Sequence, residues 1–378
     1  MLKIRKSVHT GRRLVILGIV LAIMLFAGVR PWGYTFHNTA SLQAHPPGLS
    51  FGAHGLAFTR PFVTEADVLE VNRHGLTLDL EVDMAGKPPD GFAAIAVLHN
   101  GDNASQWYLG QWQHHLVLLN GDDYDHKRRL PRISADTAKF PSGRLHLRIT
   151  SDSAGSTFSV NGERIDHRPD FIQTVPVRGR LTLGNAPDGK HPWNGTLHHF
   201  ALYRKSLGPD QPGSLTNPAP PNGSAPAGQP ATPWLFYQFD SETATAVDRR
   251  QVPDQSGNAI NLEFPLATAF LTREFLGPGT VAPFTAEITS KDGILNFFGF
   301  IPLGWIVARL IGSRTIRPGT FTVMAMTTGA GFALSFGIEF LQTWMPTRSS
   351  SLLDLVLNTV GTLAGAILAC GLARRGRL

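Results

Sequence analysis

The sequence has little of what usually identifies an enzyme or a disulfide-stabilised secreted domain. Among its 378 residues it has one cysteine, Cys370, so no disulfide within the chain can hold a domain together, and each domain depends on its apolar core. H-x-H and H-E-x-x-H metal motifs do not occur, and no strand-like segment carries the E-x-D-x-x-E pattern of paired glycosidase carboxylates. We therefore expect no metal, no cofactor and no glycoside hydrolysis.

Charged residues are also scarce, at 16% of the chain, and hydrophobicity is unevenly distributed. Four stretches are long and apolar: 14–29, 293–312, 321–342 and 352–372. A helix that crosses ~30 Å of hydrocarbon needs roughly 20 residues. The last three stretches supply them, and Trp32 and Tyr34 follow the shorter first stretch as interfacial anchors. Residues 1–30 also resemble a signal peptide, but no clean A-x-A cleavage site follows, which favours an uncleaved anchor.

Basic residues flank the apolar stretches on alternate sides. They precede the first stretch, separate the second from the third and follow the fourth: Lys3, Arg5, Lys6, Arg12, Arg13, Arg309, Arg314, Arg317, Arg374, Arg375 and Arg377. The loop between the third and fourth stretches has only Arg348. The positive-inside rule then places both termini in the cytoplasm and residues 31–290 on the extracytoplasmic side of the membrane. The net charge of +6 mostly reflects these basic residues, which flank the membrane stretches and set their orientation. We therefore expect the lipid bilayer as a partner and no nucleic-acid binding.

The region between the first two stretches, 31–290, has the pattern of antiparallel β structure. It shows no apolar periodicity of helix length, while short alternating segments recur between Gly-Asp, Asn-Gly and Ser-Gly pairs. TFSVNGERI, at 157–165, is typical of a hairpin, because Asn161-Gly162 suits a type I′ turn. Many short strands at this spacing predict an antiparallel β-sandwich.

The later part of this β region resembles a known fold family. FSVNGERI, followed by RLTLGNAPDGKHPWNGTLHHFALYRKSLGPDQ, resembles the closing strands of a LamG, or concanavalin A-like lectin/glucanase, domain, which we place at 49–207. The resemblance implies a jelly-roll sandwich of a kind that binds glycans or proteins, or serves as a spacer. Trp107, Tyr108 and Trp112 are candidates for a sugar-stacking platform, although a place in the core is the more common use of such aromatic residues.

Two further segments connect this domain to the membrane. Residues 208–233, rich in Pro, Gly, Ser and Asn, have the composition of a linker. WLFYQFDSETATAVDRRQVPDQSGNAINLEFP, at 234–265, resembles the opening of a LamG domain, but 32 residues are too few for a core of their own. They either add strands to the first sandwich, which we favour, or are the remnant of a second copy; residues 234–290 as a whole supply extra strands and a connector.

Histidines are concentrated in the same region, where all but His9 of the 14 occur. Two pairs are adjacent in sequence, His114-His115 and His198-His199. Neighbouring residues on a regular strand point to opposite faces of the sheet. We therefore expect that neither pair chelates a single metal ion.

Polar residues form stripes on the apolar stretches. At about 100° per residue, Glu339 and Gln342 share one side of the third stretch, and Asp354 and Asn358 share one side of the fourth. Asn296 of the second stretch and Arg348 of the last loop complete a set of six polar residues. We expect this set to converge near the extracytoplasmic surface: Asn296, Glu339, Gln342, Arg348, Asp354 and Asn358. Such a set either joins helices or forms a shallow site for a polar headgroup, and both interpretations stay open.

The same residues carry a second resemblance. ILNFFGFIPLG, at 294–304, and SFGIEFLQTWMPTRSSSLLDLVLNTVGTLAG resemble the VanZ-like family over 291–378. The family pattern is an E-x-x-Q pair, a loop arginine and D-x-x-x-N-x-x-G-x-x-x-G, matched by Glu339, Gln342, Arg348, Asp354, Asn358, Gly361 and Gly365. The resemblance implies four membrane spans, with Gly361 and Gly365 in helix packing and the lectin-like domain inserted after the first span. It also implies an envelope protein of a family named for glycopeptide (teicoplanin) resistance.

The expected protein is thus a multidomain one, an antiparallel β-sandwich joined to a four-span α-helical transmembrane bundle. The leading hypothesis is an envelope protein whose sandwich recognises glycan or protein. Its bundle binds a lipid headgroup or lipid-linked glycan precursor through Glu339 and Asp354, with Arg348 on phosphate. A membrane enzyme with Glu339 or Asp354 as general base is a second hypothesis, which no nucleophile motif supports. An adhesion or scaffold module with the bundle as its anchor is the third.

Overall fold

The computed structural model contains two compact units, which are described separately. One unit comprises Thr35–Thr272, and the other comprises Met1–Tyr34 with Arg273–Leu378. The structure describes residues 2–30, 36–84, 89–101, 106–121, 123–124, 126, 129–140, 143–208, 231–239, 250–267, 271, 275–277, 291–313, 318–345, 348 and 350–375. The expected linker at 208–233 therefore lies largely outside the described residues, as do Arg314, Arg317 and Arg377.

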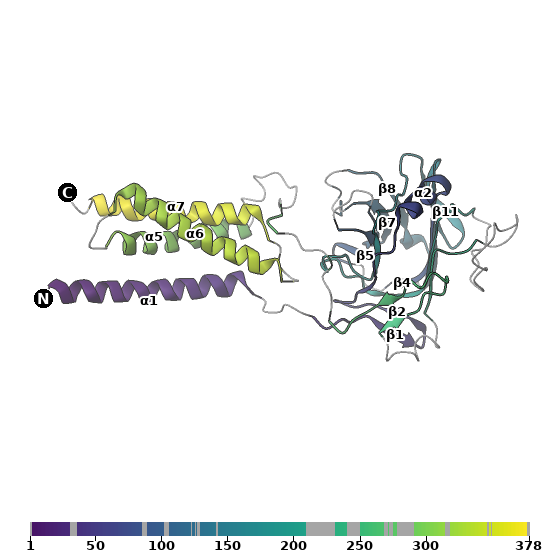
Figure 1. The fold of residues 1–378 in the computed structure, drawn as a ribbon, viewed down its shortest axis with the longest axis horizontal. Helices are drawn as coiled ribbons and strands as arrows, with labels where there is room; N and C mark the ends of the chain where they lie inside the picture. Colours follow the sequence, from purple (N-terminus) through teal and green to yellow (C-terminus); the bar gives the residue numbers. More distant parts are fainter. Residues whose placement is uncertain are drawn as a thin grey trace. The chain divides into compact units, whose positions relative to one another are not determined.

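The first unit is a sandwich of two antiparallel sheets (Figure 1). The first sheet runs in the order β1 (Ser41–Ala44), β2 (Pro47–Ser50), β13 (Gly195–Tyr203), β4 (Leu76–Met84), β9 (Arg144–Asp152), β10 (Gly155–Val160) and β11 (Glu163–Arg168), with β14 (Leu235–Gln238) also on β13. The second runs in the order β15 (Gln251–Val252), β16 (Leu262–Glu263), β3 (Ala57–Thr59), β12 (Arg180–Leu183), β5 (Phe92–His99), β6 (Trp107–Trp112), β7 (His115–Asn120) and β8 (Arg132–Asp136). The predicted sandwich is confirmed.

Alternating side chains divide each strand between the core and the outer face. In β4, Leu78, Leu80 and Val82 belong to the main apolar core, which burial removes from water. The residues between them, among them Asp79 and Glu81, face outward and meet polar partners on the neighbouring strands. One face of the first sheet is therefore apolar and its outer face is polar.

The hairpin predicted at 157–165 is confirmed, since β10 and β11 pair antiparallel on either side of Asn161 and Gly162. Both turn residues have positive φ, 52° and 82°, as a type I′ turn requires. Within the described part of this unit, a short helix, α2 (Glu65–His74), and a 3-10 turn, η1 (Thr137–Lys139), lie between the strands. The residues Glu65, Asp67 and Glu70 have E-x-D-x-x-E spacing, but they belong to α2 and not to a strand.

The segment at 234–265 adds strands to the same sandwich, as we favoured. β14 pairs with β13 in the first sheet, and β16 pairs with β3 in the second. At the other end, β1 and β2 also extend the sandwich before residue 49. β1 could not be predicted from the sequence, because it lies at a sheet edge. Its side chains are mostly exposed and do not alternate between apolar and polar.

The second unit is a bundle of four helices (Figure 1). These are α1 (Leu2–Gly28), α5 (Lys291–Ile311), α6 (Thr320–Gln342) and α7 (Leu352–Arg375). All four are long and apolar enough to cross a membrane, over Gly11–Gly28, Gly293–Ile311, Thr320–Gln342 and Leu352–Ala373. The four predicted apolar helices are confirmed, and their span-length segments agree with the prediction to within a few residues at their ends.

Glycines allow α5 and α7 to pack closely. A Cβ at Gly361 would overlap the carbonyl oxygen of Phe297, and one at Gly365 would overlap that of Ile301. Gly304 on α5 lies in the same way against the backbone of Thr362 on α7. Small residues at a helix contact permit this close approach. The resulting van der Waals packing stabilises helix association in lipid, where the hydrophobic effect contributes little.

Candidate functional site

The six polar residues predicted from the membrane stretches lie toward one end of the bundle. At this end α1 finishes at Gly28, α5 begins, α6 finishes at Gln342 and α7 begins, and we call it the α6–α7 end. Asn296 lies in the second turn of α5, just before Phe297, whose carbonyl contacts Gly361 on α7. Arg348 is in the short loop between α6 and α7.

Glu339 joins the end of α6 to the start of α7. Its side chain is buried, at 1% exposure, and Oε2 accepts a hydrogen bond of 2.8 Å from the backbone N–H of Ser351. Ser351 directly precedes α7, where backbone N–H groups have no partner within the helix and a negative charge is stabilising. Glu339 therefore acts on the helix start in the way that a capping carboxylate does.

Two amides make further bonds between helices. Gln342 Nε2 donates to the carbonyl oxygen of Gly28 at the end of α1, at 2.8 Å. Asn358 Nδ2 donates to the hydroxyl of Ser335 on α6, at 2.9 Å. Asn358 Oδ1 has no hydrogen-bond partner among the described residues although it is buried. Gln342, Asn358 and Glu339 thus link α1, α6 and α7.

The other three predicted residues are more open. Asn296, Arg348 and Asp354 are each half-buried. Asp354 lies in the first turn of α7, and its backbone N–H is 3.4 Å from the Ser351 hydroxyl oxygen. The six residues therefore form two groups, one engaged between helices and one that keeps part of its surface exposed.

The three candidate aromatic residues of β6 do not form a common platform. Trp107 is 1% exposed and belongs to the main core, while Tyr108 points to the other side of the sheet and packs against Tyr124 at a centroid distance of 5.2 Å. Trp112 is the exposed one, at 46%, and lies beside His115. Alternation along the strand separates Trp107 from the other two, so a stacking surface made of all three is excluded.

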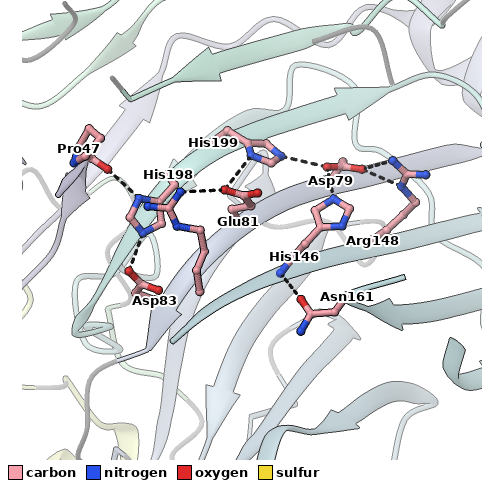
Figure 2. A network of polar contacts seen from close by, with 10 residues as sticks. Pro47, Asp79, Glu81, Asp83, His146, Arg148, Asn161, His198 and His199 are labelled. Carbon is pink, nitrogen blue, oxygen red and sulfur yellow. Dashed lines mark hydrogen bonds and ion pairs between the residues drawn. The ribbon is translucent and has the colours of Figure 1, made fainter. Parts of the chain in front are cut away.

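A polar network that the sequence did not predict covers part of the outer face of the first sheet (Figure 2). Its centre is Asp79 on β4, whose side chain is 4% exposed. Asp79 Oδ1 is 2.8 Å from His146 Nε2 on β9 and 3.0 Å from His199 Nε2 on β13. Asp79 Oδ2 accepts from Arg148 Nε at 2.7 Å. Three adjacent strands are thereby joined through one carboxylate.

A β-bulge brings both members of the His198-His199 pair into this network. The register of β13 against β4 shifts between Leu197 and His199, so His198 is the extra residue. His198 Nε2 lies 2.7 Å from Asp83 Oδ2, on the same face of β4 as Asp79, and its Nδ1 lies 2.7 Å from the carbonyl oxygen of Pro47. The expectation that the two rings point to opposite faces is wrong for this pair, because it assumed a regular strand.

The network shifts the ionisation of its members. Burial would raise the pKa of Asp79, but hydrogen bonds from His146 and His199 and the charge of Arg148 outweigh it and lower the pKa. The hydrogen bond to Asp79 raises the pKa of His146 above its usual value. Nearby, burial raises the pKa of Tyr203 to about 12. At neutral pH, Asp79 is therefore a carboxylate held among donors.

These observations define a class: a membrane protein with four apolar helices that carries an antiparallel two-sheet domain of lectin type. Residues 234–374 match the family model for VanZ/LLP1, and residues 63–211 match that for the concanavalin A-like lectin/glucanases superfamily. The chain thus combines a VanZ-like membrane region with a concanavalin A-like domain, and both resemblances are confirmed. The VanZ/LLP1 match begins at residue 234, directly before β14, so it includes β14 of the sandwich as well as α5, α6 and α7.

The solved structures that match parts of the chain are distant from it. The receptor binding domain of botulinum neurotoxin C/D mosaic serotype is 11% identical, with a TM-score of 0.33 over 47% of this chain and 43% of that one. Trypanosoma rangeli sialidase in complex with the inhibitor DANA is 18% identical, with a TM-score of 0.31 over 43% of this chain and 26% of that one. The chain spans less than two thirds of the length of either. No curated protein matches the chain.

Proposed function

We propose that this is a protein of the bacterial inner membrane with both termini in the cytoplasm and the sandwich outside. In this proposal the lectin-like domain recognises envelope glycan. The VanZ-like bundle binds the anionic headgroup of a lipid or of a lipid-linked glycan precursor at its α6–α7 end. The distribution of basic residues along the sequence supports the orientation.

The division of the six polar residues supports the headgroup site most directly. Glu339, Gln342 and Asn358 are committed to contacts between helices, which fixes the frame of the α6–α7 end. Arg348 and Asp354 are half-buried at the rim of that frame. A guanidinium binds phosphate oxygens in a bidentate way, and a carboxylate accepts from sugar hydroxyls. We therefore assign ligand contact to Arg348 and Asp354, and a bracing role to Glu339.

A purely structural bundle is the competing function, since three of the six residues already join helices. Titration of the full-length chain, in nanodiscs, with a polyprenyl phosphate separates the two. Under our proposal, Arg348→Gln weakens binding at least tenfold while abundance and melting temperature stay near wild type. Asn358→Ala, the bracing control, lowers abundance instead. If Arg348→Gln and Asp354→Asn both bind the polyprenyl phosphate with wild-type affinity, the bundle serves only as a membrane anchor.

For the sandwich, Trp112 is the remaining aromatic candidate for sugar stacking, because its ring is exposed on the outer face of the second sheet. Envelope polysaccharide fractions can be tested against the full-length chain and Trp112→Ala. Ile172→Ala is a matched control, since Ile172 is also an exposed apolar residue, at 45%. Equal binding by Trp112→Ala and wild type would remove this surface from the proposal.

A further inference from the structure

We propose that the outer face of the first sheet binds a divalent transition-metal ion of the zinc type through Asp79, His146 and His199. One ligand atom from each of these residues lies within 4.8 Å of the other two. Two imidazole nitrogens and one carboxylate oxygen are a ligand set suited to zinc and its neighbours, whereas calcium and magnesium prefer oxygen ligands alone. The site lies in the sandwich and is independent of the proposed headgroup site.

The three ligand atoms converge from three adjacent strands (Figure 2). His146 on β9 and His199 on β13 direct Nε2 at the same atom, Asp79 Oδ1 on the strand between them, at 2.8 and 3.0 Å. Tetrahedral zinc, with bonds of about 2.0–2.1 Å, keeps its ligand atoms roughly 3.3 Å apart. The two Asp79–histidine separations are thus slightly shorter than a bound ion requires, and all three ligand atoms lie within 4.8 Å of one another, so rotation of the two rings about their side-chain bonds would admit the ion.

Groups around the three ligands are suitably placed to orient them. Glu81 Oε2 lies 3.8 Å from His199 Nδ1, on the edge of the ring away from Asp79. Binding of the ion displaces the proton that His199 Nε2 donates to Asp79, and the Glu81 carboxylate favours retention of the proton on Nδ1. Arg148 is bonded to Asp79 Oδ2 and leaves Oδ1 for the ion. Asp79 and His199 thus each have a charged neighbour on the side away from the proposed ion.

The site has one open side. The His146 side chain is 34% exposed, whereas those of Asp79 and His199 are 4% and 6% exposed. An ion can therefore enter past His146 without opening the sheet. With three protein ligands, a tetrahedral ion keeps one position for water or for an oxygen of a bound molecule. The alternative is a network of hydrogen bonds and ion pairs that only holds the three strands together.

Metal titration of the full-length chain separates these alternatives. The protein is purified in nanodiscs without a polyhistidine tag, stripped with a chelator and titrated with Zn²⁺ and with Co²⁺. We expect one Zn²⁺ that Asp79→Asn, His146→Gln and His199→Gln each weaken at least tenfold, and a visible Co²⁺ spectrum of four-coordinate type that each of these variants abolishes. Glu81→Gln should cost about tenfold in affinity.

His167→Gln is the matched control, because His167 lies on β11 of the same sheet and bonds to Thr157, away from the three ligands. It should bind as wild type does. Circular dichroism and melting temperature verify folding, and His146→Gln is the decisive variant if His199→Gln fails to fold, since His146 is partly exposed. A wild-type chain without a stoichiometric ion, or one whose affinity His146→Gln and Asp79→Asn leave unchanged, would overturn the proposal.

Discussion

The bundle and the sandwich each contain a cluster of polar side chains, and the two clusters are partnered differently. At the α6–α7 end, Glu339 and Gln342 bind backbone groups of other elements in the bundle. On the outer face of the first sheet, Asp79 instead gathers two imidazoles and a guanidinium from neighbouring strands. In the bundle, polar atoms mainly connect helices, because lipid offers them no partner. On the sheet they join three neighbouring strands through ionisable side chains, of which His146 is partly exposed.

The largest expected effect tests the helix contacts of the bundle. Gly361→Leu should destabilise the bundle by several kcal/mol, above the ~1–3 kcal/mol typical of overpacking, because the new side chain meets the Phe297 backbone and not a flexible group. Abundance in membranes and the melting temperature of the purified chain measure it. Gly299→Ala is the control, since a Cβ there meets nothing within 4 Å. Equal loss in both variants would mean that close α5–α7 packing is not the cause.

The second-largest effect is expected on the stability of the sandwich, and it depends on pH. Burial lowers the pKa of His99 from 6.5 to about 3, so the folded state keeps this ring neutral. Between these values the unfolded chain binds a proton that the folded chain does not, and stability falls as pH falls, by at most about 1.4 kcal/mol per unit.

Thermal unfolding of the full-length chain from pH 7 to pH 4, followed by tryptophan fluorescence, measures this loss. His99→Leu should flatten the dependence, whereas His37→Leu serves as a comparison outside the sheets. An unchanged slope in His99→Leu would assign the acid sensitivity to other groups.

A somewhat smaller effect is expected where α6 meets α7. Glu339→Ala removes the acceptor of the Ser351 N–H and should cost ~1–3 kcal/mol, the usual penalty for a buried donor left without a partner. Glu339→Gln keeps an acceptor oxygen and should lose less. Chemical or thermal unfolding in nanodiscs compares the two with Arg348→Gln. If Arg348→Gln destabilises as much as Glu339→Ala, the division between bracing and contact residues is incorrect.

The smallest stability effect is expected at Trp112. Trp112→Ala removes an exposed ring, so the melting temperature should change by no more than a degree or two, within the ±0.5 kcal/mol usual for surface substitutions. Trp107→Ala, in the core of the same strand, should cost about 3–5 kcal/mol. Similar melting temperatures for the two variants would contradict the placement of these rings on opposite faces.

The elements that follow simple periodicity could be predicted from the sequence. The four spans follow from uninterrupted apolar length, and the β10–β11 hairpin follows from Asn161-Gly162. The bulge at His198 could not be predicted, because it is a register shift between two strands that are more than a hundred residues apart. The alternating Asp79, Glu81 and Asp83 of LTLDLEVDM were a usable signal of a polar outer face, but only the fold shows which strands meet them.

The positions of the candidate membrane residues along the helices could be predicted from the sequence, while their hydrogen-bond partners could not. Helical spacing placed Glu339, Asn358 and Asp354 toward one end of the bundle, but spacing does not show which of them face another helix. That depends on how each helix is rotated against its neighbours, which long-range packing such as the contact of Gly361 on α7 with α5 and of Gly331 on α6 with Thr362 reflects. Glu339, a leading candidate for ligand contact, accepts a hydrogen bond from the Ser351 N–H directly before α7, which helical spacing alone does not predict.

Native mass spectrometry of the full-length protein released from nanodiscs tests the central proposal most directly, that the α6–α7 end holds an anionic headgroup at Arg348. In lipid mixtures that contain a polyprenyl phosphate, the wild-type chain and Gly299→Ala should retain one such molecule. Arg348→Gln should lose it and remain folded. Retention of the same lipid by Arg348→Gln and by Asp354→Asn would contradict the account.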